Sequence, residues 1–328
     1  MAQLSAAPSG LQKVQNGRSK PLYRRNLWAD AFRRLLRNRL SLVGLVIFSL
    51  LVIVAIFGPA LAPYPYMEQH LDNVAEGPSL VFWLGTDDLG RDLFSRTLWG
   101  ARTAAIVAII STVFSLALGI VLGALAAYLG GWVDWLVSRL IDITMSIPSL
   151  LFASLIAATF RTPVAQWVDA LYVRTNWGFF STTTYVDLIV VFGTLSLIQW
   201  PNYARLIRGQ ILALRKLPYI EAAQVVGAPE GRIVFFHLVP NALGPVIVAV
   251  TFGFAGAIVA ESALSFLGVG VQPPQASWGN MINDNALSWR YRPWLVAVPG
   301  FTIAIVSLGI NFLGDGLNDA LNPRTVQK

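Results

Sequence analysis

Long apolar stretches alternate with short polar segments along most of this chain, and six of them are long enough to cross a membrane. A helix needs roughly 20 consecutive apolar residues to cross the hydrocarbon core of a bilayer. The stretches are residues 41–61, a segment within 103–133, and residues 143–160, 186–203, 241–266 and 294–314. The fourth is the weakest, because its charge-free core is short. The pattern predicts an all-α, polytopic membrane protein with about six transmembrane helices.

The residues before the first apolar stretch divide into two parts. Residues 1–25 are polar and predict a flexible tail. In residues 26–40, apolar side chains recur at helical spacing, and Arg33, Arg34 and Arg37 fill the opposite face. This pattern is typical of a basic amphipathic helix that lies in the membrane interface. The alternative is a plain cytoplasmic extension of the first span.

Composition agrees with a membrane protein. Charged residues make up 12% of the chain and hydrophobic residues 55%, whereas a soluble domain carries about 25% charged residues. The chain has no cysteine, which excludes disulfides and thiolate chemistry. A net charge of +7 suggests nucleic acid as a partner for a soluble protein, but here the position of the basic residues argues against that partner.

The basic residues predict the orientation of the chain. With six spans, 16 Lys and Arg residues fall on the side that holds both termini, and 7 fall on the other. Because Lys and Arg accumulate on the cytoplasmic side, both termini are expected in the cytoplasm, in a multi-pass protein of the cytoplasmic (inner) membrane. The first span, 41–61, then leads to an outer loop at 62–101. A core domain at 102–314 holds five spans and a cytoplasmic segment at 205–240, and a cytoplasmic tail follows at 315–328.

The most informative polar segment is residues 218–241, which lies between two predicted spans on the cytoplasmic side. Pro218 is suited to the first turn of a helix, and Gly227 is suited to its end because glycine tolerates positive φ. Ala228-Pro229 then begins a second helix that leads back into the membrane. A short, exposed helix of small residues predicts a contact with a partner protein.

The first outer loop carries clustered carboxylates, including Asp87, Asp88 and Asp92. Their spacing does not match an EF-hand calcium loop. We expect instead that Thr86 or Asp87 caps a short helix and that Arg91 and Arg96 form local ion pairs. A second outer segment, 161–185, is predicted to be a long aromatic loop, and residues 268–293 a turn-rich aromatic plug at the outer interface.

Little in the sequence indicates an enzyme. None of the four lysines follows a glycine, so the chain has no phosphate-binding Walker A loop. The two histidines, His70 and His237, fall on opposite sides of the predicted membrane, and without cysteine they cannot form a metal cluster.

One carboxylate, Glu261, follows about five turns of apolar helix. Ionisable groups in membrane spans usually face the interior of a bundle or a wet path. Glu261 is therefore a candidate residue of a transport path or gate. The alternative is a hydrogen-bonded structural carboxylate near the outer headgroups.

Four segments together resemble a known family. Glu221-Ala222-Ala223, Gly227 and Pro240-Asn241 resemble the EAA motif of ABC importer permeases. The segments 85–102, 261–279 and 315–324 resemble those of the dipeptide/oligopeptide/nickel transport family, and in particular its second, C-type permease subunit. The outer-loop match rests on Gly85, Asp87, Gly90, Arg91 and Asp92. The resemblance extends from about residue 24 to 325, and the aromatic segment 161–185 departs from it.

The resemblance implies a type I ABC importer permease fold and a non-catalytic role in ATP-driven import of peptides by alternating access. The implied partners are a paralogous permease, two ABC ATPase subunits, an extracytoplasmic binding protein and membrane lipids, but not nucleic acid. The chain itself binds no cofactor, because ATP and Mg²⁺ act through the ATPases. The implied ATPase contacts are Tyr219, Glu221, Ala222, Ala223, Gly227, Ala228 and Pro229.

Two other functions stay open at this point. The same machinery imports nickel or another non-peptide solute in some members of the family. An ion-coupled secondary transporter needs carboxylates in broken helices at the midplane of the membrane, and only Glu261 lies deep enough in a predicted span.

Overall fold

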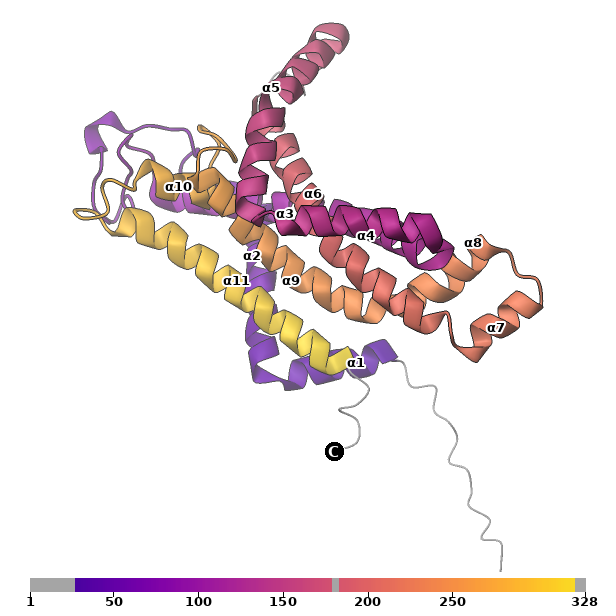
Figure 1. The fold of residues 1–328 in the computed structure, drawn as a ribbon. Coiled ribbons are helices and arrows are strands. Elements are labelled where there is room, and N and C mark those ends of the chain that lie inside the picture. The colour runs from indigo at the N-terminus through magenta and orange to yellow at the C-terminus, as the bar shows by residue number, and fades with distance from the viewer. Residues whose placement is uncertain (1–26, 179–182, 322–328) are drawn as a thin grey trace, which may run out of the picture.

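The computed structural model describes residues 27–178 and 183–321, and helices form nearly all of the regular structure there, as predicted (Figure 1). In chain order these are α1 Leu27–Arg37, α2 Arg39–Leu61, the 3₁₀ turn η1 Leu71–Asn73, α3 Leu93–Leu129, α4 Gly131–Ser146, α5 Ser149–Thr175, α6 Thr183–Leu214, α7 Pro218–Val225, α8 Glu230–Arg232, the π-helical segment η3 Ile233–Leu238, α9 Val239–Phe266, α10 Trp278–Asp284 and α11 Trp294–Leu321.

The structure contains several helices of membrane-spanning length. In the described residues, four are long and apolar enough to cross a membrane: α2, α3, the continuous helix Glu230–Phe266, and α11. The pair of α4 and α5 adds a fifth crossing if the two count as one bent span. At 32 residues α6 is also long enough, but it falls short of the others in hydropathy, in keeping with the weak apolar signal of residues 186–203.

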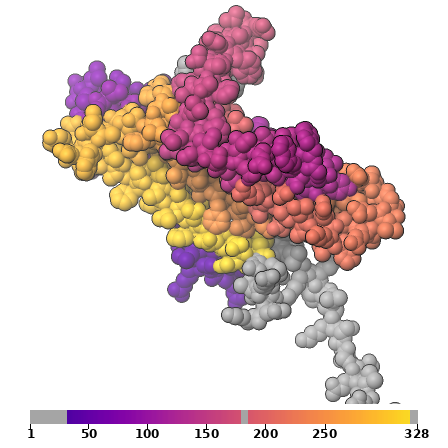
Figure 2. All heavy atoms as spheres, viewed as in Figure 1, coloured from indigo at the N-terminus to yellow at the C-terminus, as the bar shows by residue number. Residues whose placement is uncertain are grey.

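The third predicted span, residues 143–160, is wrong as one straight helix. α4 ends at Ser146, α5 begins at Ser149, and the two helices are bent by 96°. Pro148 accounts for the break, because proline disfavours helical backbone at the residue before it, and Ile147 is extended with φ −95° and ψ 134°. Beyond the break, α5 projects from the bundle and packs against the first part of α6 (Figure 1, Figure 2).

Three helices continue into segments that the sequence assigned to loops or tails. α5 extends to Thr175, so most of the predicted outer loop 161–185 is helical, and residues 179–182 of it lie outside the described chain. α3 begins inside the predicted outer loop 62–101, and α11 runs into the predicted tail 315–328. An apolar pattern marks where a helix crosses the membrane, whereas the helix itself ends only where its backbone is capped.

The N-terminal helix α1 is separate from α2, as the amphipathic pattern of residues 26–40 predicted. Asn38 divides them: its Oδ1 accepts a hydrogen bond from the Leu40 N–H at 3.0 Å and so caps α2. α1 packs against α2 and α11, near the C-terminal end of α11 (Figure 1). Its location in a membrane interface stays a prediction. The predicted tail, residues 1–25, lies outside the described residues.

Close contacts at glycine hold the bundle together. α3 and α6 form the most extensive helix pair. A Cβ at Gly123 would lie 2.5 Å from the Ala204 carbonyl oxygen, and one at Gly119 would lie 2.9 Å from the Ala204 nitrogen. α2 approaches α11 in the same way, because a Cβ at Gly44 would lie 2.6 Å from the Leu313 nitrogen. Small residues permit such approach, and the dense packing that results stabilises helix association in lipid.

This packing predicts opposite effects for two glycine substitutions. Gly123→Ala inserts a methyl group between two backbones and should cost about 1–3 kcal/mol of stability. Gly209→Ala, on α6 with nothing within 4 Å of its Cβ position, should be neutral or stabilise by up to about 1 kcal/mol. The measurement is the melting temperature of the purified chain in detergent. Equal melting temperatures for the two variants would contradict close packing at Gly123.

Candidate functional site

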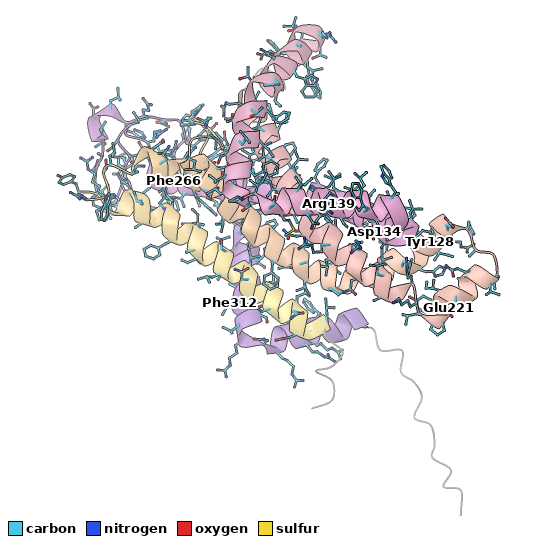
Figure 3. The ribbon with its side chains drawn as sticks, viewed as in Figure 1. Tyr128, Asp134, Arg139, Glu221, Phe266 and Phe312 are labelled. Carbon is cyan, nitrogen blue, oxygen red and sulfur yellow. The ribbon has the colours of Figure 1, made fainter. Side chains whose placement is uncertain are left out.

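The polar segment between α6 and α9 forms an exposed helical hairpin at one end of the bundle. Figure 3 places Glu221 at this end and Phe266 at the other. α7 begins at Pro218 and ends in a Schellman motif, in which the Ala228 N–H donates to the Ala223 carbonyl oxygen at 3.0 Å and the Gly227 N–H donates to the Gln224 carbonyl oxygen at 2.9 Å. Gly227 has φ +79°, which confirms its predicted place at the helix end.

α7 turns one face to the core and the other outwards. Ile220 is fully buried in an apolar cluster that includes Ile211 and Leu238, and Ala223 and Ala228 pack against this cluster. Among the residues expected to contact an ATPase, Tyr219, Glu221, Ala222, Gly227 and Pro229 are exposed. Ala223 and Ala228 are half-buried, and their contact with an ATPase stays a prediction.

Sequence reasoning missed the most exposed apolar residues of this hairpin. Val225 and Val226 are 88% and 87% exposed at the end of α7. The available signal was two adjacent β-branched residues directly before the glycine of an otherwise polar segment. Exposed apolar groups that cluster on a rigid helix indicate a protein contact surface.

Ion pairs fix the base of the hairpin to neighbouring helices. The guanidinium of Arg208 on α6 donates to both carboxylate oxygens of Asp134 on α4, at 2.5 and 2.8 Å. Arg215 donates to the Ala127 carbonyl oxygen of α3 at 2.9 Å. Asp134 and Tyr128 lie at the same end of the bundle as Glu221 (Figure 3). These contacts tie the end of α6 to the core while α7 stays accessible.

Beyond the hairpin, the chain re-enters the bundle as one long helix. Pro229 is the N-cap of α8 rather than its first helical residue, a small correction to the prediction. α8, η3 and α9 together form a continuous 37-residue helix from Glu230 to Phe266. π-helical segments such as η3 often occur at functional sites. Any displacement of the hairpin therefore acts directly on α9.

A cavity of about 1220 Å³ lies between α6, α9, α11 and the break between α4 and α5. Non-helical backbone at membrane depth is tolerated where it lines a cavity, and residues 144–150 around the break form part of the wall. The lining as a whole is apolar or uncharged polar, and it contains no Asp, Glu, Lys, Arg or His side chain. The polar side chains are Thr144, Ser146, Ser149, Gln199, Asn202, Tyr203, Ser307 and Asn311.

Glu261, the candidate path residue, is fully buried on α9 and is not among the residues that line this cavity. Its Oε1 accepts hydrogen bonds from Ser265 at 2.8 Å and from Ser277 at 2.7 Å, and its Oε2 accepts one from Ser262 at 3.3 Å. Ser277 also begins α10 with a capping box. Glu261 thus joins the end of α9 to the segment that follows it.

The first outer loop is held by buried ion pairs. Arg91 Nε lies 2.6 Å from Asp87 Oδ2, and Arg91 Nη2 lies 3.1 Å from Asp284 on α10. Arg96 is also buried, 3.8 Å from Asp87, and donates to the Tyr66 carbonyl oxygen at 3.2 Å. The expected local ion pairs are confirmed, and they also bridge to a distant helix. No group of three metal-ligating side chains occurs among the described residues.

The predicted helix cap in this loop is wrong. Asp92, rather than Thr86 or Asp87, caps α3 by accepting a hydrogen bond from the Ser95 N–H at 2.8 Å. The error arises because no separate short helix begins after Thr86 or Asp87, and α3 itself begins earlier than expected, at Leu93, with Asp92 directly before it. Gly85 and Gly90 have φ of +79° and +73°, so both turns of the motif need glycine.

Comparison with known families gives two matches. Residues 119–327 match the family described as binding-protein-dependent transport system inner membrane component. Residues 26–78 match the N-terminal transmembrane domain of oligopeptide transport permease C. Together these matches include the hairpin, the cavity and the first span.

Individual relatives cover nearly the whole chain. The dipeptide transport system permease protein DppC of Alkalihalophilus pseudofirmus is 38% identical over 297 residues, which are 90% of each protein. The oligopeptide transport system permease protein OppC of Bacillus subtilis is 38% identical over 299 residues, which are 91% of this chain and 90% of that one.

A solved structure shares the fold. A chain of the MetNI methionine ABC transporter, in an inward-facing conformation, superposes with a TM-score of 0.53 at 19% identity, and the match covers 69% of this chain and 96% of that one. This confirms the predicted fold of a type I ABC importer permease. The chain belongs to the family of binding-protein-dependent transport system inner membrane components.

Proposed function

We propose that this chain is the permease subunit of an ATP-driven importer that passes peptides from an extracytoplasmic binding protein across the cytoplasmic membrane by alternating access. One observation carries the proposal. The second limb of the exposed hairpin, after the turn at Gly227, is the start of the continuous helix Glu230–Phe266, and Val259, Ala260 and Ala263 of that helix line the cavity. A partner that moves the hairpin would therefore change the width of the cavity.

The relatives' names and the cavity chemistry both favour peptides over nickel. The relatives are named dipeptide and oligopeptide permeases. A nickel path is expected to offer imidazole, thiolate or carboxylate ligands, and the cavity wall of this chain has none of them. An uncharged wall with hydroxyl and amide groups suits peptides of varied side chains, because it neither attracts nor repels a particular charge.

The hairpin supports docking to an ATPase. We place Val225 and Val226 at the centre of the contact, with Tyr219, Glu221 and Ala222 around them. Glu221 lies in the first turn of α7, where a carboxylate also complements the helix dipole. ATP and Mg²⁺ would be bound by the ATPases, since this chain has no Walker A loop, and the chain would be non-catalytic.

The proposed assembly has two permeases, two ATPases and a binding protein. The second permease is a paralogue of this chain, and it would close the open side of the cavity beside the projecting α5. In this arrangement the hairpin, both termini and the interfacial helix α1 are on the cytoplasmic side, and the ion-paired outer loop faces the binding protein. Membrane lipids surround the apolar outer faces.

A secondary transporter is a weaker alternative on two counts. Such a protein needs an ionisable group in contact with the path, and Glu261, the one candidate that the sequence offered, lies outside the cavity wall. Its three serine donors are what a structural carboxylate requires. We therefore favour the structural role for Glu261, which joins α9 to α10.

Transport by the reconstituted complex tests the proposed function. Proteoliposomes that hold this chain, its paralogue and the ATPases should take up a labelled tripeptide only with ATP on the ATPase side and binding protein on the other. The control omits one of these components at a time. Uptake by this chain alone, driven by a proton gradient, would overturn the proposal.

A substitution at the end of α7 tests the ATPase contact. Gly227→Asp should lower the recovery of the ATPases with this chain at least about fivefold, because an acidic side chain at positive φ strains the turn and disturbs the contact. Gly268 is a matched control: it has φ +76°, open space at its Cβ position and the same hydrogen bonds at the other end of the bundle. Gly268→Asp should leave ATPase recovery unchanged, and equal losses would contradict the coupling role.

A substitution at Glu261 separates its two possible roles. If Glu261 is structural, Glu261→Gln should lower the yield of folded chain and the uptake of peptide by the same factor, since only hydrogen bonding changes. The measurement compares total uptake with the yield of folded chain in membranes, so uptake per mole of purified complex should stay unchanged. A loss of uptake several times larger than the loss of yield would restore the path role.

A further inference from the structure

The cavity wall contains polar atoms that are buried and have no hydrogen-bond partner. In the described chain, these are Gln199 Oε1, Tyr203 Oη and Ser307 Oγ, and all three residues line the same cavity. Leaving such an atom unpaired costs about 1–3 kcal/mol. Three unpaired atoms on one wall therefore indicate a function that needs them free.

Other hydroxyl groups on the helices around the cavity are hydrogen-bonded within their own helix. Thr144 and Ser146 also line the wall, but they donate to carbonyl oxygens of their own helix, Leu140 and Ile143, at 2.8 Å each. On α11, Thr302 donates to Val298 at 2.8 Å. Ser307, one and a half turns further along the same helix, makes no such bond.

Gly253 of α9 leaves space for the polar atoms of Gln199 and Tyr203. Gln199 and Tyr203 are four residues apart on α6, so they share one face. That face meets Gly253 of α9, where a Cβ would collide with the Tyr203 hydroxyl and lie 3.7 Å from Gln199 Oε1. Tyr203 is only 3% exposed. In this conformation the hydroxyl is therefore packed against α9, and a ligand reaches it only when α6 and α9 separate during the transport cycle.

The chemistry of the groups defines what they bind. Hydroxyls of tyrosine and serine donate and accept, and the glutamine oxygen accepts. The cavity wall has no charged side chain. The wall therefore selects no particular charge, and its polar groups suit a ligand that carries both hydrogen-bond donors and acceptors. Main-chain amides of a peptide have this property, because each residue other than proline carries one N–H donor and one C=O acceptor.

We propose that Gln199, Tyr203 and Ser307 form a binding site for the main-chain amides of a peptide during its passage. The inference rests on the proposed function and adds the residues and the recognition mode. Recognition of the main chain accepts any side-chain sequence, and the apolar remainder of the wall accommodates the side chains. Asn202 and Asn311, which line the same cavity, extend this polar surface.

Cysteine labelling tests the site, because the chain has no cysteine of its own. Ser307→Cys and, as a control, Ser154→Cys are introduced singly. Ser154 is half-buried on α5 and bonded within its helix, to the Leu150 carbonyl oxygen at 2.8 Å. The probe is a tripeptide with free termini whose central cysteine is activated as a pyridyl disulfide. Attack by the protein thiolate forms a protein–peptide disulfide and releases pyridine-2-thione.

The complete complex with binding protein and ATP should label Ser307→Cys at least about tenfold faster than Ser154→Cys, and excess trialanine should suppress the labelling at 307. Labelling at equal rates, or without protection, while the unsubstituted complex still imports trialanine would overturn the inference alone. Failure of the unsubstituted complex to import trialanine would overturn the proposed function and the inference together.

A second variant tests the hydroxyl itself. Tyr203→Phe removes one oxygen and keeps the ring, so it should reduce trialanine imported per ATP hydrolysed by about two- to tenfold, the value of one hydrogen bond. Tyr172→Phe on α5 is the control and should leave this ratio unchanged. An unchanged ratio for Tyr203→Phe would contradict a role for the hydroxyl in binding.

Discussion

Close approach of α3 and α6 is the constraint on which the rest of this molecule depends. A membrane helix gains little by exchanging lipid for apolar protein, so dense packing at small residues must hold it in place. Gly119 and Gly123 allow α6 to lie with its backbone at Ala204 against α3. This contact fixes Tyr203 beside Gly253 and sets the direction in which α6 leaves the bundle towards the hairpin. The ion pair of Arg208 with Asp134 then holds the base of the hairpin.

The two ends of the bundle and its middle have different physical characters, and each suits its proposed task. The end that holds residues 85–96 is cross-linked, because Arg91 pairs with Asp87 and with Asp284 of α10, and Glu261 joins α9 to the N-cap of α10. The opposite end presents the exposed apolar tip of α7. Between them lies a cavity whose wall keeps polar atoms unpaired. The proposed gate thus has three parts: a cross-linked end, the exposed hairpin and the uncharged cavity. The helix Glu230–Phe266 connects the hairpin to the cavity.

The sequence predicted the parts that depend on local pattern, and missed those that depend on distant contacts. Apolar stretches located the helices, and Gly227 marked the end of α7, because both are properties of a few neighbouring residues. The break at Ile147 and Pro148 lies inside an apolar stretch, where hydropathy does not reveal it. The cap at Asp92 was missed because the start of α3 was placed wrongly. The pairing of Tyr203 with Gly253 requires knowledge of which helices touch, and no single stretch contains it.

The central claim is that nucleotide-driven movement of the hairpin is transmitted through the helix Glu230–Phe266 to the cavity. The most direct test is the distance between spin labels at Leu151→Cys on α5 and Val259→Cys on α9, two exposed positions beside the cavity in a chain that has no other cysteine. The account predicts that a non-hydrolysable ATP analogue bound to the assembled complex shifts this distance distribution. An identical distribution with and without nucleotide, in a complex that still imports peptide, would contradict it.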